Sequence, residues 1–200
     1  MPDTKVGKKN GLGYRDVIVL VIWLMIASFI FYQQTKYSNE AAHTNKALPE
    51  WPAQCPIACK SWTLVMAVHP YCACTKASLN ELERLVSRAP VKINTVVLFY
   101  RPADKDRSWQ TSTESWSTAG RIPSSERVDD VDGKLASEFD ATTSGEVYLY
   151  DTSGHLRFHG GVTGERSHEG DNEGEDAVIA ILGGSKTAPA TTPVFGCSVR

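Results

Sequence analysis

The sequence has almost no net charge, and it lacks the short motifs that define several large enzyme classes. Its 21 lysines and arginines nearly balance its 23 aspartates and glutamates, so the formal net charge of −2 gives no reason to expect a nucleic-acid partner. The H-E-x-x-H zinc motif, the EF-hand loop, the dinucleotide-binding glycine fingerprint and the serine nucleophile elbow are all absent. The haem attachment motif C-x-x-C-H is absent as well. Any chemistry must therefore come from residues outside these motifs.

The N-terminal region contains one uncharged apolar segment, residues 17–32, in which Ser28 is the only polar residue. It is apolar on every face and predicts a single membrane-spanning helix, although it is shorter than the roughly 20 residues of a typical span. Four basic residues precede it: Lys5, Lys8, Lys9 and Arg15. The first base after it is Lys36, so the positive-inside rule places residues 1–16 in the cytoplasm. A cleaved signal peptide is the alternative, but no A-x-A site directly follows the apolar run.

The rest of the chain is predicted to lie on the extracytoplasmic, periplasmic side of the cell membrane. Residues 33–50 are polar and are expected to form a linker, residues 51–184 one folded domain, and residues 185–200 a Pro/Thr-rich tail. All five cysteines follow the apolar segment, in a compartment where disulfides can form. Because five is odd, at least one thiol must be free, metal-bound or paired between chains.

Apolar runs alternate with amphipathic segments over residues 51–184. The apolar patterns predict strands over residues 61–68, 93–100, 127–131, 146–151 and 155–160. Leucines on one face predict a helix that begins between Cys74 and Ser78 and ends before Pro90. Shorter helices are expected over residues 132–139 and 176–182. This order predicts an α/β three-layer sandwich, a central mixed sheet with helices on both faces.

Two further features are interpreted as structural. Trp109 and Trp116 are seven residues apart, so one helical face could carry both, and we expect them in the core. The glycine-rich run at residues 160–172 lacks the lysine of a phosphate-binding loop. We therefore expect this run to be a structured loop near the active end of the domain.

The most informative stretch is VMAVHPYCACT at residues 65–75. An apolar run ends at His69-Pro70, Cys72 and Cys74 follow one residue apart, and the amphipathic helix comes next. A thiol at a helix N-terminus faces unpaired backbone N–H groups and the positive end of the helix dipole, and both favour the thiolate. Because the thiolate is the nucleophile and the metal ligand, this stretch predicts thiol redox or metal chemistry.

Three segments carry a resemblance to known proteins: HPYCACTKASLNEL at 69–82, TTSGEVYLYDTSGHLRFHGGVTGERSHEGDN at 142–172 and PVFGC at 193–197. Together with the order of the elements, they make residues 50–184 similar to the thioredoxin-like superfamily. Within it, the chain most resembles membrane-anchored RedB-type thioredoxin-like proteins. The resemblance implies a thioredoxin-like fold and thiol–disulfide exchange with a protein thiol or disulfide partner. No soluble cofactor is then needed, because electrons arrive from another dithiol protein.

Two positions depart from the ordinary thioredoxin pattern. Cys72 and Cys74 are separated by one residue instead of two, so a disulfide between them would close a smaller ring, and strained disulfides are more oxidising. Residues 143–146 read TSGE where the superfamily has a cis-proline that docks substrate and keeps metals off the thiols. The missing proline leaves room for metal binding at this site.

The leading hypothesis is a membrane-anchored thiol–disulfide oxidoreductase. Cys72 attacks as the thiolate, Cys74 resolves the mixed disulfide or stabilises the charge, and His69 lowers a thiol pKa or moves a proton. Three other cysteines are structural or resolving candidates: Cys55, Cys59 and Cys197. The C-x-x-x-C spacing of Cys55 and Cys59 favours a structural disulfide, whereas the sequence does not place Cys197 relative to the site.

Two alternatives stay open at this stage. Cys72, Cys74 and His69 could bind copper(I), because thiolates and imidazole suit soft metals, in a protein that serves metalloenzyme assembly. The domain could instead be a non-catalytic docking module that disulfides stabilise.

Overall fold

The computed structural model describes residues 13–59 and 61–200, in two compact units that divide between Tyr37 and Ser38. Its first element, α1 (Tyr14–Asn39), is a 26-residue helix with an 18-residue window of mean hydropathy 2.1, and none of its residues is buried. At 1.5 Å per residue it is about 39 Å long, which exceeds a hydrocarbon core of about 30 Å. The helix therefore has the length and composition of a membrane anchor or a signal segment. Most of the predicted cytoplasmic segment, residues 1–12, lies outside the described residues.

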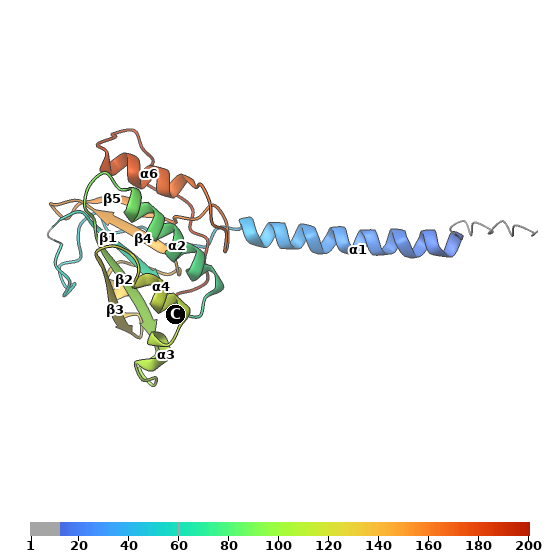
Figure 1. Ribbon diagram of the computed structural model, residues 1–200, viewed down its shortest axis with the longest axis horizontal. Helices are drawn as coiled ribbons and strands as arrows, with labels where there is room; N and C mark the ends of the chain where they lie inside the picture. The colour runs from blue at the N-terminus through green and yellow to red at the C-terminus, as the bar shows by residue number, and fades with distance from the viewer. Residues whose placement is uncertain (1–12, 60) are drawn as a thin grey trace, which may run out of the picture. The chain divides into compact units, whose positions relative to one another are not determined.

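The second unit is built on one five-stranded sheet with the strand order β3-β2-β1-β4-β5 (Figure 1). The strands are β1 (Thr63–Val68), β2 (Asn94–Arg101), β3 (Ser125–Val131), β4 (Glu146–Tyr150) and β5 (Leu156–Gly160). β1, β2 and β3 run parallel, whereas β4 is antiparallel to β1 and to β5. The sheet is therefore mixed, as predicted. All six residues of the central strand β1 are buried, as a strand covered on both faces requires.

Helices cover both faces of this sheet, and successive side chains of the strands point to opposite faces. The helices are α2 (Ala73–Arg88), α3 (Ser108–Thr111), α4 (Glu114–Ala119), α5 (Lys134–Glu138) and α6 (Glu173–Leu182). α2, α4 and α6 pack together over one face, where Leu64 and Met66 of β1 meet the leucines of α2 (Figure 1). The other face carries Val65 and Ala67 and is covered by α5 and by residues of the 47–59 segment.

Two local expectations are corrected by the structure. The helix after the cysteines begins at Ala73, so Ser78 lies in its second turn instead of capping it. Trp109 and Trp116 do not share one helix, because Thr113 is extended between α3 and α4 and its side chain accepts the N–H of Trp116. Trp116 packs against the core, whereas Trp109 lies elsewhere, beside the cysteine turn.

The C-terminal tail packs along the sheet and ends near the cysteine turn. Backbone N–H groups of His159 and Gly161 donate to tail carbonyl oxygens at 2.9 and 3.2 Å. Further along, the tail forms an antiparallel bridge between Thr143 and Ser198. Its side chains Val194 and Val199 are 2% and 1% exposed. The tail is therefore packed as part of the second unit.

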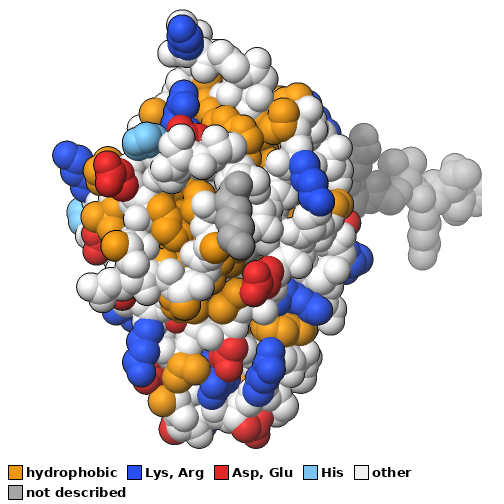
Figure 2. All heavy atoms as spheres, turned by 90° about the vertical axis from the view of Figure 1, so that its left-hand side faces the viewer, with side chains coloured by type: hydrophobic (Ala, Val, Ile, Leu, Met, Phe, Trp, Pro, Cys, Tyr) orange, Lys and Arg blue, Asp and Glu red, His pale blue; other side chains and the backbone are white. Residues whose placement is uncertain are grey.

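The surface of this unit carries charges of both signs. On the face shown in Figure 2, lysine, arginine, aspartate and glutamate side chains are interspersed with apolar and neutral ones, without a broad field of one sign. A nucleic-acid-binding face would need clustered basic side chains, and this face does not show them.

Candidate thiol site

Cys72 occupies the position that joins β1 to α2. The chain leaves β1 at Val68 and turns so that the N–H of Cys72 donates to the His69 carbonyl at 3.1 Å. Cys72 is the N-cap residue of α2, with an extended backbone (φ −74°, ψ 128°). An N-cap side chain lies over the free N–H groups of the first helical turn. The expected thiol at a helix N-terminus is thus present, and it is Cys72.

Three cysteines converge at this point of the fold. The sulfur atoms of Cys72, Cys74 and Cys197 all lie within 4.8 Å of one another. Cys72 and Cys74 are buried, whereas Cys197 is exposed, and all five cysteines of the chain are free thiols. Cys197 comes from the C-terminal tail, more than a hundred residues away in sequence, and it supplies the third sulfur of the group.

Hydrogen bonding makes Cys72 more acidic than Cys197. Burial by itself raises the pKa of Cys72, but hydrogen bonds from the Cys197 thiol, the Cys197 N–H and the N–H groups of Cys74 and Thr75 outweigh it, and the net pKa lies below the ordinary value. Cys197 is exposed but loses part of its hydration to the atoms around it, and this partial desolvation, the hydrogen bond that it donates to Cys72 and the charge there raise its pKa to about 11. Cys72 therefore ionises first, and Cys197 keeps its proton and donates it.

The glycine-rich run, residues 160–172, contacts both Cys74 and the C-terminal tail. The Ser167 hydroxyl donates to the Cys74 sulfur at 3.4 Å. The neighbouring Arg166 guanidinium donates to the Gly196 carbonyl of the tail. These two contacts place the loop of residues 160–172 beside Cys74 and the C-terminal tail.

His69 lies beside the thiols but outside the sulfur cluster. Its Nδ1 accepts the N–H of Tyr71 at 3.2 Å, and its ring stacks on Tyr100 with centroids 5.5 Å apart. Burial lowers the pKa of His69, which favours the neutral ring. Among the described residues, the three-membered group of potential metal ligands here contains Cys197 and does not contain His69. The ring therefore supports the turn before Cys72, and the third residue near Cys72 and Cys74 is Cys197, whereas the sequence analysis proposed His69.

An aromatic wall borders the thiol site on its open side. Tyr71 is exposed, its ring lies 4.7 Å from that of Trp109, and its hydroxyl donates to the Trp109 carbonyl at 2.7 Å. Cys72 lines a surface pocket of about 530 Å³ between the start of α2 and the α3–α4 connection, with residues 70–73, Lys76 and residues 112–115 around it. Sequence reasoning placed Trp109 in the core, because the break at residues 112–113 carries no strong signal.

Ser144 is a second residue that sequence reasoning missed. Its Oγ accepts the N–H of His69 at 2.9 Å and shares a hydrogen bond of 2.8 Å with the Thr75 hydroxyl. Its N–H donates to the Cys197 carbonyl at 2.8 Å. Ser144 thus connects the end of β1, the first turn of α2 and the tail. No cis peptide bond occurs here or elsewhere in the described residues.

The loop that carries Ser144 rests on a buried carboxylate. Oε2 of Glu146 accepts the N–H groups of Thr142 and Thr143 at 2.9 and 3.0 Å. Oε1 accepts the Tyr148 hydroxyl at 2.8 Å and lies 2.7 Å from Nε2 of His159. A fully buried carboxylate with four partners holds this loop in one conformation.

Cys55 and Cys59 lie at the other end of the sheet. The Cys59 thiol contacts the carbonyl of Asp151. Asp151 follows Tyr150, which pairs with Thr63 at the start of β1, so Cys59 lies near that end of the strand. Because β1 from Thr63 to Val68 spans roughly 17 Å at 3.3 Å per residue, these thiols are too distant to resolve Cys72. The expected disulfide between Cys55 and Cys59 is not formed, since both are free thiols. Burial raises the pKa of each.

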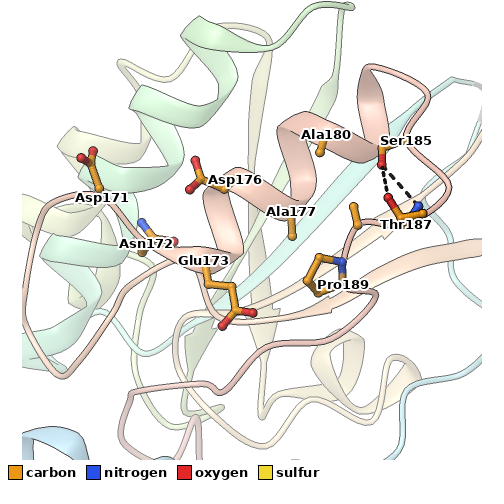
Figure 3. A pocket seen from close by; sticks show the side chains of 10 residues that line it. Asp171, Asn172, Glu173, Asp176, Ala177, Ala180, Ser185, Thr187 and Pro189 are labelled. Carbon is orange, nitrogen blue, oxygen red and sulfur yellow. Dashed lines mark hydrogen bonds between the residues drawn. The ribbon is translucent and has the colours of Figure 1, made fainter.

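A larger pocket of about 590 Å³ lies beside α6 and contains no thiol (Figure 3). Glu173 projects to the opposite side from Asp171 and Asp176, and Ser185 and Thr187, whose hydroxyls are 3.4 Å apart, lie at the other end of the pocket (Figure 3). The thiol chemistry therefore belongs to the smaller pocket at Cys72.

Neither a protein-family model nor a curated protein matches this sequence. Solved structures do match. An uncharacterized conserved protein from Geobacillus kaustophilus is 16% identical, with a TM-score of 0.58, covering 81% of this chain and 92% of that one. A hypothetical protein from Sinorhizobium meliloti 1021 is 15% identical, with a TM-score of 0.57, covering 80% and 93%. Mycobacterium tuberculosis dsbF aligns at a TM-score of 0.42 and 11% identity, over 62% of this chain and 81% of that one.

The comparisons and the topology show the fold. The mixed five-stranded sheet with helices on both faces is a thioredoxin-like fold. In it, a cysteine pair stands at the N-terminus of the helix that follows the central strand. The chain therefore combines a thioredoxin-like fold with a Cys-x-Cys pair and an N-terminal apolar helix.

Proposed function

We propose that this protein is a membrane-anchored, exported thiol–disulfide oxidoreductase that acts through Cys72. The observation that carries the proposal is the environment of the Cys72 sulfur. It stands at a helix N-terminus, neighbouring groups of Cys197, Cys74 and Thr75 lower its pKa, and the residue lines an open pocket. A thiol with a depressed pKa beside an open pocket is the kind that attacks disulfides.

The reaction is a two-step exchange. The Cys72 thiolate attacks one sulfur of a partner disulfide, forms a mixed disulfide and releases the first partner thiolate. A second thiol of this chain then attacks Cys72 and releases the second. Cys74 contributes at least its N–H to the thiolate, and His69 supports the turn through the N–H of Tyr71. Electrons return from another dithiol protein.

We assign the helix α1 as an uncleaved anchor through residues 17–32. Basic residues precede it, so residues 1–16 stay in the cytoplasm and the domain at residues 51–184 faces the extracytoplasmic, periplasmic side. This arrangement fits the resemblance to membrane-anchored RedB-type proteins. It also exposes the thiols to protein partners in a compartment where disulfides occur.

The direct test is reduction of a protein disulfide by the full-length chain in detergent, with dithiothreitol as the electron source. Cys72→Ser is expected to abolish the activity, because serine cannot form the mixed disulfide. Cys59→Ser is the matched control, since Cys59 lies at the far end of the sheet, and it is expected to retain activity. Equal activity in the wild type and Cys72→Ser contradicts the proposal.

Copper(I) binding is the second candidate function, and the convergence of three sulfurs favours it. Metal–thiolate bonds of about 2.3 Å require sulfurs within roughly 4.6 Å of one another. The separations here, all within 4.8 Å, are close to that limit, so Cys72, Cys74 and Cys197 fit one soft metal ion with little movement.

Titration of the reduced protein with copper(I) against a coloured chelator tests this second function. One equivalent should bind tightly, and either Cys72→Ser or Cys197→Ser should weaken it, whereas His69→Ala should not. If the wild-type protein cannot take copper(I) from the chelator, the copper-binding proposal is wrong. If the protein neither reduces disulfides nor binds copper(I), and its native thiols resist alkylation, the remaining hypothesis is a non-catalytic docking module.

A further inference from the structure

The last seven residues, 194–200, form a segment that we name the C-terminal strap. Two buried valines anchor it at its ends, and two backbone hydrogen bonds join it to the loop before β4. One runs from the N–H of Ser144 to the carbonyl of Cys197 at 2.8 Å, and the other from the N–H of Val199 to the carbonyl of Thr142 at 2.9 Å. Cys197 therefore has a fixed position.

The strap approaches this loop more closely than a side chain would allow. A Cβ atom built at Gly196 would lie 2.0 Å from the carbonyl oxygen of Ser144, so glycine is required there. The Gly196 carbonyl also accepts a hydrogen bond from Arg166. These contacts hold the next residue, Cys197, against Cys72.

Cys197 and Cys74 both lie close to Cys72, but they are not equivalent. All three sulfurs lie within 4.8 Å of one another. The thiol and the backbone N–H of Cys197 both help to lower the pKa of Cys72, whereas Cys74 contributes only its backbone N–H, and its sulfur accepts the Ser167 hydroxyl. A Cys72–Cys74 bond would close a small and strained ring, because only one residue separates the two cysteines. A Cys72–Cys197 bond joins residues far apart in sequence and avoids that strain.

The pocket beside Cys72 offers a place for a partner disulfide. The pocket of about 530 Å³ is lined by Cys72 and by neither Cys74 nor Cys197. We place the incoming partner in this pocket, because it brings the partner to Cys72 without displacing the strap. The exposed Tyr71 ring and the ion pair of Lys76 with Glu114, 2.7 Å apart, border this route.

We infer that Cys197 is the resolving cysteine and that the strap is a built-in second half of the redox site. This inference rests on the proposed function and names the second thiol of the exchange. Cys72 takes one sulfur of the partner disulfide. The Cys197 sulfur then attacks the Cys72 sulfur and forms a Cys72–Cys197 disulfide, while the bond between Cys72 and the partner breaks. The proton of the Cys197 thiol passes to the departing partner sulfur, which leaves as a thiol. Two electrons pass to the partner, and a dithiol protein later reduces the internal disulfide.

The test uses the reduced full-length protein in detergent, with Cys55→Ser and Cys59→Ser as the background that removes the distant thiols. One molar equivalent of 5,5′-dithiobis(2-nitrobenzoic acid) is added, the released nitrothiolate is followed by absorbance, and the product is mapped by mass spectrometry. The background protein should release about two equivalents and contain a Cys72–Cys197 disulfide. Adding Cys197→Ser should reduce the release to about one equivalent and leave the nitrothiol attached to Cys72. Adding Cys74→Ser instead should still give the Cys72–Cys197 disulfide.

The possible failures are distinguishable. If Cys197→Ser still releases two equivalents and carries a Cys72–Cys74 disulfide, the strap inference is wrong and the oxidoreductase proposal survives. If no adduct forms at Cys72 in either protein, the proposed function itself is wrong. Thermal unfolding of each variant checks the fold, and serine at the exposed position 197 should leave the unfolding temperature close to that of the background.

Discussion

The two ends of the central strand hold two groups of cysteines in opposite chemical environments. At its C-terminal end, hydrogen bonds outweigh burial and lower the pKa of Cys72. Before its N-terminal end, burial raises the pKa of Cys55 and of Cys59, and few donors oppose it. Both groups contain a short cysteine spacing, so spacing does not decide reactivity. The difference lies in the number of N–H and S–H donors that reach the sulfur.

The largest expected effect is a difference in alkylation rate between the two ends. Iodoacetamide at neutral pH should modify Cys72 first in the reduced native protein, and Cys55 and Cys59 last, because the thiolate fraction changes about tenfold for each unit of pKa. Mass spectrometry of a time course measures this order, with the urea-denatured protein as the control. Similar rates at all five cysteines contradict the comparison.

Local sequence patterns were enough to predict the mixed sheet, the helix that follows the first strand and the position of Cys72 at the N-terminus of that helix. Those features depend on hydrophobic periodicity and on neighbours within a few residues. Cys197 was not placed, because its position depends on backbone pairing of residues 197–199 with residues 142–144, and backbone pairing leaves no side-chain signature. Trp109 was misplaced for a related reason, since Thr113 breaks the helix through a single cap.

The next largest effect is expected from Gly196→Ala, which disturbs the packing of the strap and retains all five cysteines. The new Cβ would overlap the Ser144 carbonyl, so the strap must shift, at a cost of about 1–3 kcal/mol in unfolding free energy. Cys197 should move away from Cys72, and a Cys72–Cys197 disulfide should form more slowly.

Gly164→Ala is the matched control, because a Cβ at Gly164 meets nothing within 4 Å. Urea unfolding in detergent and the rate of internal disulfide formation are measured for both variants. If Gly196→Ala and Gly164→Ala are equally stable and equally fast, the strap does not position Cys197.

A smaller effect is expected when one donor is removed from the thiol site. Cys197→Ala deletes the thiol hydrogen bond to Cys72 and keeps the backbone N–H, so the pKa of Cys72 should rise part of the way to its ordinary value. At neutral pH the alkylation rate of Cys72 should fall accordingly. The pH profile of that rate measures the shift, and Cys197→Ser, which retains a hydroxyl donor, should shift less. An unchanged profile in Cys197→Ala shows that the thiol donor is unimportant.

The smallest effect should appear in how stability depends on pH, and its sign differs between the two ends. Because the pKa of Cys72 is lowered on folding, the unfolded chain binds more protons below pH 9, and this thiol stabilises the fold increasingly as pH rises from its native pKa toward its ordinary value of 9.0. The pKa of Cys59 is raised, so its contribution is present below that ordinary value and is lost as pH rises above it. The unfolding free energy lost in Cys72→Ser should therefore grow between pH 6 and pH 9, whereas that lost in Cys59→Ser should be constant there and shrink above pH 9. Urea unfolding across this range, under reducing conditions, measures both differences. If the loss of unfolding free energy depends on pH in the same way in the two variants, the two ends of the strand stabilise a thiolate equally.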